Sequence, residues 1–412
     1  MVTFGELEND GVLSFLNGIS AAEHTSSGSG VTHIRPFNVT ANGRIDLTQR
    51  KIIPNKEQLF RYALDDMDIV FNNTNSEDLV GKTGLWRTTQ GSYAISNHMT
   101  RIRVLRQDRV SPGFLAFWFL YLWFCGDSRK LSRRYVNQAN IALERLRSLS
   151  VPTTEITVQQ RIAAILSKIQ EAVDIQARAL AILEELTAAT QAKFFDGHSW
   201  PETALGEIAR VGNGSTPNRN EPRYWIHGSL PWLTSGKVHE GIIESADEFV
   251  TDAARRECHL PAVPPSSIVV AITGQGKTLG NAALVTFETC VNQHLAYITI
   301  HSDKILPGFL LAFLQSRYDD LRAVGQSGGT TKGALTCGYL KTLRIPLPSM
   351  DEQRLVTSTF KALFESKRVA EAKLKVLEEL FDTTLDSLMS GKIAINAEGW
   401  PSPPEFVSDR TP

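Results

Sequence analysis

The sequence predicts an α+β protein made of two similar modules, each containing strands and short helices and each followed by one long helix. Two observations lead to this prediction. Short segments of the first half recur in the second half in the same order, and two long segments carry apolar side chains at helical spacing. A chain of 412 residues, 42% of them hydrophobic and with a formal net charge of −1, is long enough for several globular domains.

The repeat is clearest around the start of each long helix. "LRSLSVPTTEITVQQRI" at 146–162 resembles "LKTLRIPLPSMDEQRLV" at 340–356, so that Leu149 and Leu343 stand at matching positions. Five further pairs keep the same order: LAILEEL with LKVLEEL, SPGFLAF with LPGFLLAF, ISNHM with VNQHL, DIVF with SIVV, and FGEL with LGEI. The number of residues between matching segments changes slightly along the chain, while the order of the segments is kept. We therefore expect one scaffold with loops of different length.

The two ends of the chain resemble a junction between modules that has been opened. "SWP" at 199–201 recurs as "GWP" at 399–401, close to the C-terminus. The segment "LGEI", which follows the first of these, has its counterpart "FGEL" at residues 4–7. We therefore predict a pseudo-twofold arrangement in which the two termini are neighbours.

The two predicted long helices cover 157–193 and 351–389. A seven-residue ladder of equivalent positions joins Ile162 with Val356, Ile169 with Leu363, Gln176 with Ala370, and Leu183 with Leu377. We expect the helices to pack on each other as an antiparallel coiled coil. The apolar residues off or beyond this seam predict a surface for a partner; they are Ile165, Ile175, Ile182, Phe194 and Phe195.

The predicted domains follow from these elements. They are 1–150 and 197–345 for the two modules, 151–196 and 346–392 for the helical spacer regions, and 393–412 for a tail.

"FLAFWFLYLWFC" at 114–125 is too short to span a membrane and predicts a buried helix. The four cysteines show no close pair and the acidic N-terminus has no signal-peptide pattern, so we expect a cytoplasmic protein.

One stretch offers an alternative interpretation. "AITGQGKT" at 271–278 follows a strand-like apolar run and fits the phosphate-binding loop of nucleotide hydrolases if alanine is accepted at its first position. That loop requires a helix beginning at its Lys-Thr pair, whereas Gly280 and Asn281 weaken any helix and strand-like residues follow them. The equivalent loop of the first copy, "NNTNSEDLVGKT", lacks the pattern. We therefore expect a variable loop on a shared scaffold.

The chain resembles the specificity subunit of type I restriction–modification systems. The resemblance is carried by "ALGEIARVGNGSTPNRNEPRYWIHGSLPWLTSGKVHEGII" at 204–243, by "VNQHL" at 291–295 and by "LKTLRIPLPSMDEQRLV" at 340–356, and it extends over the whole chain. The first copy departs from the pattern, with "GVTHIRPFNVTANGRI" at 30–45 and "SVPTTEITVQQRI" in place of the second copy's motifs. In this family such modules are target-recognition domains.

The resemblance implies a sequence-specific DNA-binding subunit without catalytic activity. It implies that each target-recognition domain reads one half of a bipartite double-stranded DNA site and that the helices set the gap. The implied partners are two methyltransferase (modification) subunits and restriction/translocase subunits. S-adenosylmethionine, ATP and Mg would be bound by those partners, and this chain would have no cofactor, no metal and no catalytic residue of its own. No membrane partner is implied.

Base reading and phosphate binding need directional polar side chains, which both copies carry in loops at equivalent places of the repeat. The candidates for DNA contact are Arg35, Asn38, Asn72, Asn73, Thr74, Asn75, Arg133, Arg134, Tyr135, Asn137 and Gln138 in the first copy, and Thr234, Ser235, Lys237, Thr273, Gln275, Lys277, Ser327, Thr330, Thr331 and Lys332 in the second. The aligned histidines His98 and His294 are interpreted as structural. The competing functions are a nucleotide-binding enzyme using Ala271–Thr278, and a coiled-coil scaffold that does not bind DNA.

Overall fold

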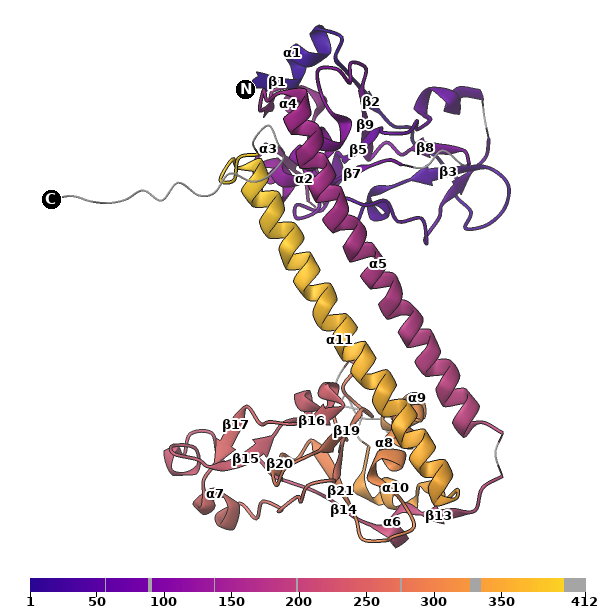
Figure 1. The fold of residues 1–412 in the computed structure, drawn as a ribbon, viewed down its shortest axis with the longest axis vertical. Coiled ribbons are helices and arrows are strands. Elements are labelled where there is room, and N and C mark those ends of the chain that lie inside the picture. Colours follow the sequence, from indigo (N-terminus) through magenta and orange to yellow (C-terminus); the bar gives the residue numbers. More distant parts are fainter. Residues whose placement is uncertain are drawn as a thin grey trace, which may run out of the picture. The chain divides into compact units, whose positions relative to one another are not determined.

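The computed structural model describes residues 1–55, 57–87, 91–136, 138–197, 199–274, 276–326 and 335–395 (Figure 1). The chain forms two compact units. Unit 1 comprises Met1–Ala177 and Lys373–Pro412, and unit 2 comprises Arg178–Ala372. Each of the two long helices therefore contributes one part to each unit. No helix in the described part of the chain is both long enough and apolar enough to cross a membrane.

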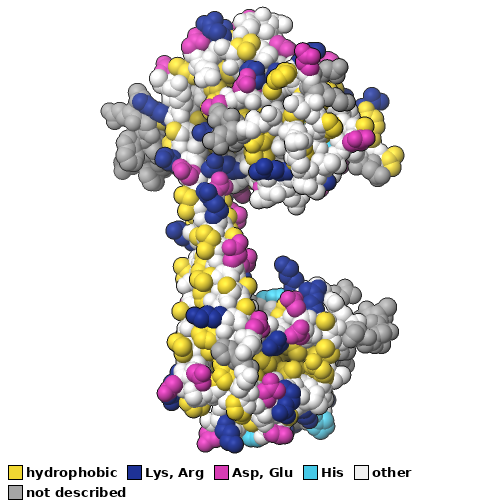
Figure 2. Space-filling view, turned by 90° about the vertical axis from the view of Figure 1, so that its right-hand side faces the viewer, with side chains coloured by type: hydrophobic (Ala, Val, Ile, Leu, Met, Phe, Trp, Pro, Cys, Tyr) yellow, Lys and Arg dark blue, Asp and Glu magenta, His cyan; other side chains and the backbone are white. Residues whose placement is uncertain are grey.

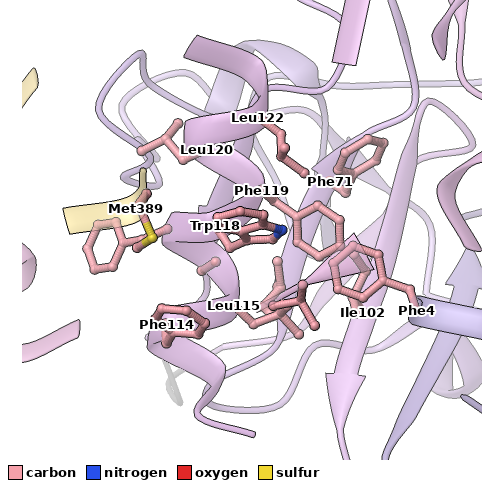
Figure 3. Close-up of a cluster of buried hydrophobic side chains, with 14 of the residues drawn as sticks. Phe4, Phe71, Ile102, Phe114, Leu115, Trp118, Phe119, Leu120, Leu122 and Met389 are labelled. Atoms are coloured by element: carbon pink, nitrogen blue, oxygen red, sulfur yellow. The ribbon is translucent and has the colours of Figure 1, made fainter. Parts of the chain in front are cut away.

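The core of unit 1 lies between an antiparallel sheet and one apolar helix. The sheet contains, in order, β2 (Leu13–Asn17), β9 (Met99–Val104), β5 (Ile69–Asn72) and β7 (Thr83–Leu85). Helix α2 (Pro112–Phe124) begins after Ser111, whose side chain caps it, and confirms the predicted buried helix. The ring of Phe119 stacks on Phe4 at 4.5 Å and meets Phe71 edge-on at 5.5 Å between the ring centroids (Figure 3).

Smaller sheets complete unit 1. The first contains β4 (Ile52–Ile53), β3 (Val31–Ile34) and β8 (Tyr93–Ile95), the second contains β10 (Arg133–Arg134), β11 (Ala139–Asn140) and β6 (Thr74–Asn75), and the third pairs β1 (Val2–Thr3) with β12 (Ser150–Val151). The remaining helices are α1 (Phe4–Asn9), α3 (Asp127–Leu131), α4 (Leu143–Arg147), η1 (Pro36–Asn38) and η2 (Glu57–Tyr62). The β1–β12 pair ties the N-terminus of the chain to the residues just before the first long helix.

Unit 2 is built in the same way. Its main sheet contains β14 (Ala209–Asn213), β21 (Leu295–Ile300), β18 (Ile268–Ala271), β19 (Ala282–Val285) and β16 (Ile242–Ile243). The smaller sheets are β17 (Glu248–Val250) with β15 (Leu230–Leu233) and β20 (Cys290–Val291), and β13 (Glu202–Ala204) with β22 (Arg344–Pro346). The helices are α6 (Leu205–Ile208), α7 (Asp252–Glu257), α8 (Pro307–Ser316), α9 (Tyr318–Gln326), α10 (Cys337–Thr342), η3 (Pro222–Tyr224) and η4 (Ser235–Glu240).

The two units share one topology, as the sequence repeat predicts. The order β2-β9-β5-β7 of unit 1 corresponds to β14-β21-β18-β19 of unit 2. Strand β3 pairs antiparallel with β4 and parallel with β8, and β15 pairs in the same two ways with β17 and β20. The mixed α and β character and the similarity of the two modules are therefore confirmed.

The long helices are α5 (Ile156–Phe195) and α11 (Met350–Met389), close to the predicted 157–193 and 351–389. Within unit 2 their segments run antiparallel, because Glu184 pairs with Lys367 at 3.0 Å while Phe195 stacks on the earlier Phe360 at 6.0 Å. The predicted domain boundaries and the pseudo-twofold arrangement stay predictions.

The predicted partner surface on the helices needs a correction. Phe195 is buried among aromatic rings of unit 2, so the prediction that it belongs to this surface was wrong. Ile165 and Phe194 are half-buried and pack against the cores of their own units. Ile175 and Ile182 remain exposed, as that prediction requires.

Candidate nucleic-acid interface

Two of the predicted DNA-contacting segments of unit 1 meet in one small sheet. Asn75 pairs with Ala139 and Thr74 with Asn140, while Asn140 also pairs with Arg133. At the tip of the β10–β11 hairpin the Arg133 guanidinium lies 5.9 Å from the centroid of the exposed Tyr135 ring. The other described candidates here are Arg134, which forms an ion pair with Glu77, and the exposed Gln138. Asn137 lies outside the described residues.

Three predicted asparagines are buried, and each makes hydrogen bonds that support its loop. Asn38 holds its loop together by donating to the carbonyl oxygens of Asp46 and Gln49 at 2.8 and 2.9 Å. Asn72 donates to the Leu79 carbonyl at 2.9 Å, and Asn73 to the Thr100 hydroxyl at 3.0 Å. Because these amides are withdrawn from the surface, the structure gives them a positioning role, which sequence alone does not distinguish from a surface role.

Arg35 lies beside a pair of histidines. Its guanidinium is 3.2 Å from Nε2 of His24, and the same atom of His24 is 3.0 Å from Nδ1 of the buried His33. Burial, together with the nearby charge of His24, lowers the pKa of His33 from 6.5 to about 4. His33 is therefore neutral at pH 7, and Arg35 carries the charge of this group.

Four asparagines line a pocket of about 360 Å³ in unit 1, which we call the asparagine pocket. Asn17 ends β2, Asn97 lies in the turn between β8 and β9, and Asn73 and Asn140 come from the segments described above. Asn17 and Asn97 are exposed, and sequence reasoning missed both. The recurrence of "ISNHM" as "VNQHL" is the signal that marks the Asn97 turn.

The predicted loops of unit 2 lie at the same edge of its scaffold. The Asn73 amide donates to the His98 carbonyl at 3.0 Å in unit 1, and the Ile272 amide donates to the His294 carbonyl at 2.9 Å in unit 2. The next contact also recurs, because the amide of Ile141 donates to the Asn73 carbonyl at 2.9 Å and that of Leu335 to the Ile272 carbonyl at 2.7 Å. Equivalent backbone contacts therefore hold different side chains.

Among the unit 2 candidates, Lys237 has a side chain that is held in place by two carboxylates. Its ammonium group pairs with Glu240 at 2.5 Å and with Asp247 at 3.1 Å, and its side chain is only 11% exposed. Thr234 and Ser235 are half-buried at the start of η4. Gln275, Ser327, Thr330, Thr331 and Lys332 lie outside the described residues.

The "AITGQGKT" stretch is part of a β-hairpin. Strand β18 ends at Ala271, and the chain returns as β19, which pairs antiparallel with it. No helix begins at Thr278, so the anion-binding helix end that a nucleotide loop requires does not follow. Lys277 is exposed, and its carbonyl accepts a hydrogen bond of 3.0 Å from Tyr318. The structure thus argues against the nucleotide-binding alternative.

Around this hairpin, polar side chains contact one another at the surface. Thr273 bonds to Nδ1 of His294, and Nε2 of His294 is 3.1 Å from the amide nitrogen of Gln293. Gln293 in turn accepts from Thr216. Gln293 and His294 are both exposed, and Gln293 stands where Asn97 stands in unit 1. Thr216 and Gln293 were also missed from sequence.

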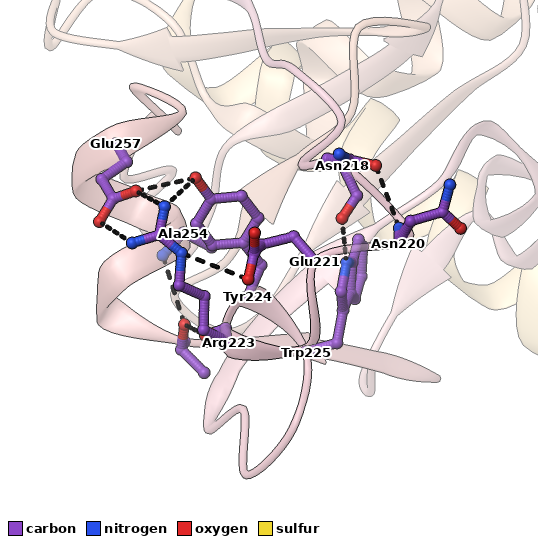
Figure 4. Close-up of polar contacts among 9 residues, drawn as sticks. Asn218, Asn220, Glu221, Arg223, Tyr224, Trp225, Ala254 and Glu257 are labelled. Atoms are coloured by element: carbon purple, nitrogen blue, oxygen red, sulfur yellow. Dashed lines mark hydrogen bonds and ion pairs between the residues drawn. The ribbon is translucent and has the colours of Figure 1, made fainter.

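The loop before β15 carries a second polar group (Figure 4). Arg223 pairs with Glu257 of α7 at 2.7 Å, and Tyr224 donates to the same carboxylate at 2.8 Å. The Arg219 guanidinium lies 4.1 Å from the Trp225 ring centroid and pairs with Glu248. These carboxylates neutralise the cations, so the group stabilises the loop rather than forming a basic patch.

The arginine-rich segment 101–109 is neutralised in a similar way. Arg103 makes two hydrogen bonds to Asp68, at 2.7 and 2.6 Å, while Arg106 pairs with Asp108 at 2.8 Å. Arg101 donates to the Ala63 carbonyl at 2.5 Å. The described residues contain no cluster of three His, Cys, Asp or Glu side chains that could hold a metal ion.

The two similar modules, with polar loops held at equivalent places in each, match a known class of protein. The chain belongs to the family of type I restriction modification DNA specificity domains, which matches residues 37–185 and 198–379. Both modules are therefore copies of the domain that the sequence resemblance indicated.

Individual relatives agree with this assignment. The chain is 22% identical over 403 residues to the putative type I restriction enzyme MjaX specificity subunit of Methanocaldococcus jannaschii, covering 92% of this chain and 91% of that protein. It is 27% identical over 155 residues to the EcoR124I/EcoR124II specificity subunit of Escherichia coli, covering 37% and 38%. The S subunit of a type I restriction-modification system from M. genitalium has the same fold, with a TM-score of 0.65, 16% identity, and coverage of 94% and 95%.

Proposed function

We propose that this chain is the non-catalytic, DNA-reading subunit of a type I restriction–modification complex. Each unit binds one half of a bipartite double-stranded target, and partner subunits methylate adenine or restrict the DNA. The observation that carries the proposal is that equivalent backbone hydrogen bonds, from Asn73 to His98 in unit 1 and from Ile272 to His294 in unit 2, hold different exposed side chains beside them. These are Asn97 in unit 1 and Gln293 in unit 2. One scaffold with two different polar surfaces is what reading two different half-sites requires.

The long helices supply the surface for the methylating partners. Six exposed apolar residues, between 47% and 63% exposed, occupy equivalent positions 194 residues apart: Ile175 with Val369, Ile182 with Val376, and Leu186 with Leu380. Hydrophobic side chains are visible on the helices in Figure 2. Repeated apolar surface of this kind marks a protein interface, and its duplication supports two modification subunits per chain.

The catalytic groups belong to the partners under this proposal. S-adenosylmethionine would be bound by the modification subunits, and ATP and Mg by the restriction subunits. The helices would form one antiparallel coiled coil that relates the modules by a pseudo-twofold axis and sets the gap between half-sites. The whole assembly would act on DNA in the cytoplasm.

Sequencing of adenine methylation tests the proposal. A host that carries the chain with its modification subunits should methylate a motif of two short half-sites separated by unread bases. Removing the chain should abolish that methylation. A continuous motif, or methylation that persists without the chain, would contradict the proposal.

Activity of the purified chain separates the competing functions. We expect no ATPase, nuclease or methyltransferase turnover from the chain alone. Turnover that survives purification to homogeneity would favour the enzyme alternative, whereas a chain that binds no duplex DNA would favour the scaffold alternative.

A further inference from the structure

We infer that Asn97 selects adenine in the half-site bound by unit 1, an inference that rests on the proposed function. Asn97 is exposed in the β8–β9 turn and lines the asparagine pocket. Its side chain makes no hydrogen bond to another described residue, whereas Asn17 and Asn140 are each held by a threonine hydroxyl. Asn97 therefore has both its amide donor and its acceptor free for a ligand.

The composition of the pocket favours a base edge over a phosphate. Its lining residues are Asn17, Asn73, Asn97, Asn140, Ile141, Ala142, Leu143 and Glu144, and none of them is Lys or Arg. The exposed Glu144 carboxylate would repel a phosphate group. An asparagine amide, by contrast, matches the N6 donor and N7 acceptor of adenine in the major groove.

The neighbouring amides have fixed orientations. Oδ1 of Asn17 accepts from Thr100 at 2.7 Å, which leaves its NH₂ group directed away from that contact. The NH₂ group of Asn140 donates to the Thr74 hydroxyl at 2.7 Å and to the Asn73 carbonyl at 3.2 Å, while Oδ1 of Asn140 accepts from no described residue. Asn17 thus offers donors and Asn140 an acceptor in the same pocket as Asn97, so the pocket is organised before DNA binds.

Selection of bound duplexes from a random-sequence pool tests the inference with the full chain. The wild-type chain should select adenine at one position of the first half-site. Asn97→Ala should lose that preference and bind the wild-type site about 5- to 150-fold more weakly, as expected for one bidentate pair. Asn97→Asp, which is isosteric but only accepts hydrogen bonds, should shift the preference toward cytosine, whose N4 group donates.

Two controls make the result decisive. Asn9→Ala changes an exposed asparagine at the end of α1, which does not line the pocket, and should leave the motif unchanged. The second half-site should keep its sequence in every variant, which shows that the chain is folded. A wild-type motif that Asn97→Ala leaves unchanged overturns the inference alone, whereas a wild-type chain that selects no motif overturns the proposed function and the inference with it.

Discussion

Gln159 and Gln353, which stand 194 positions apart, make the same two hydrogen bonds in the two units. Oε1 of Gln159 accepts from the Ser111 amide at 2.9 Å, and Oε1 of Gln353 accepts from the Leu306 amide at 2.8 Å. Each Nε2 donates to a carbonyl just before its own helix, at 2.9 and 3.0 Å. Both side chains are buried, so they fix the start of each long helix against the module that precedes it.

Replacing Gln159 by alanine should destabilise unit 1. The change leaves the buried Ser111 amide without its acceptor, which costs about 1–3 kcal/mol in the free energy of unfolding. Hydrogen–deuterium exchange should show faster exchange in unit 1 peptides and little change in unit 2. The exposed neighbour Gln160 is the matched control, and equal effects of Gln159→Ala and Gln160→Ala would contradict the role given to Gln159.

The buried His33 should make unit 1 less stable in acid. Its pKa is about 4 in the folded chain and near 6.5 when unfolded, so the unfolded state binds more protons in between. Stability is complete above pH 6.5, falls as the pH drops towards 4, and loses at most about 3 kcal/mol. Denaturation at several pH values should show a flatter profile for His33→Gln than for the wild-type chain, and substitution of the exposed His301 by Gln is the control.

Lengthening helix α5 should lengthen the gap between half-sites. Four residues inserted after Ala188 add about 6 Å at 1.5 Å per residue, close to two base pairs. The insertion rotates the following residues by little more than one helical turn, so the side of the module that contacts DNA keeps nearly the same orientation. The methylated motif should show a longer gap and unchanged half-sites, and altered bases would count against the modular arrangement.

Replacing Lys277 by alanine should weaken recognition through the second half-site only. The ammonium group is exposed and forms no ion pair with a described carboxylate, which suits it to a phosphate. Loss of one such contact should reduce the slope of log K against log salt by about 1. Lys341→Ala, an exposed lysine on α10, is the control, and a changed first half-site would refute the assignment. We make the same prediction for Lys332→Ala, although Lys332 itself lies outside the described residues.

Introducing a carboxylate into either copy of the exposed apolar surface on the long helices should remove one methylating partner. Ile182→Asp and Val376→Asp should each lower the number of bound modification subunits from two to one, because a carboxylate is costly in an apolar interface. Native mass spectrometry of the co-expressed complex measures this number. Glu185→Gln, which changes an exposed neighbour of Ile182, is the control and should keep two bound modification subunits. A wild-type complex with one modification subunit per chain would show that the partner count is wrong.

Recurring segments were enough to predict the repeat, a continuous apolar run predicted the buried α2, and apolar side chains at helical spacing predicted the long helices. The residues after Thr278 likewise showed that "AITGQGKT" lacks the helix of a nucleotide loop. Which asparagines reach the surface, however, depended on the folded chain. Asn72 and Asn73 look as polar in sequence as Asn17 and Asn97, yet the former are buried at a strand end. Burial depends on strands brought together from distant parts of the chain, such as Asn72 opposite Met99, and no local pattern records that pairing.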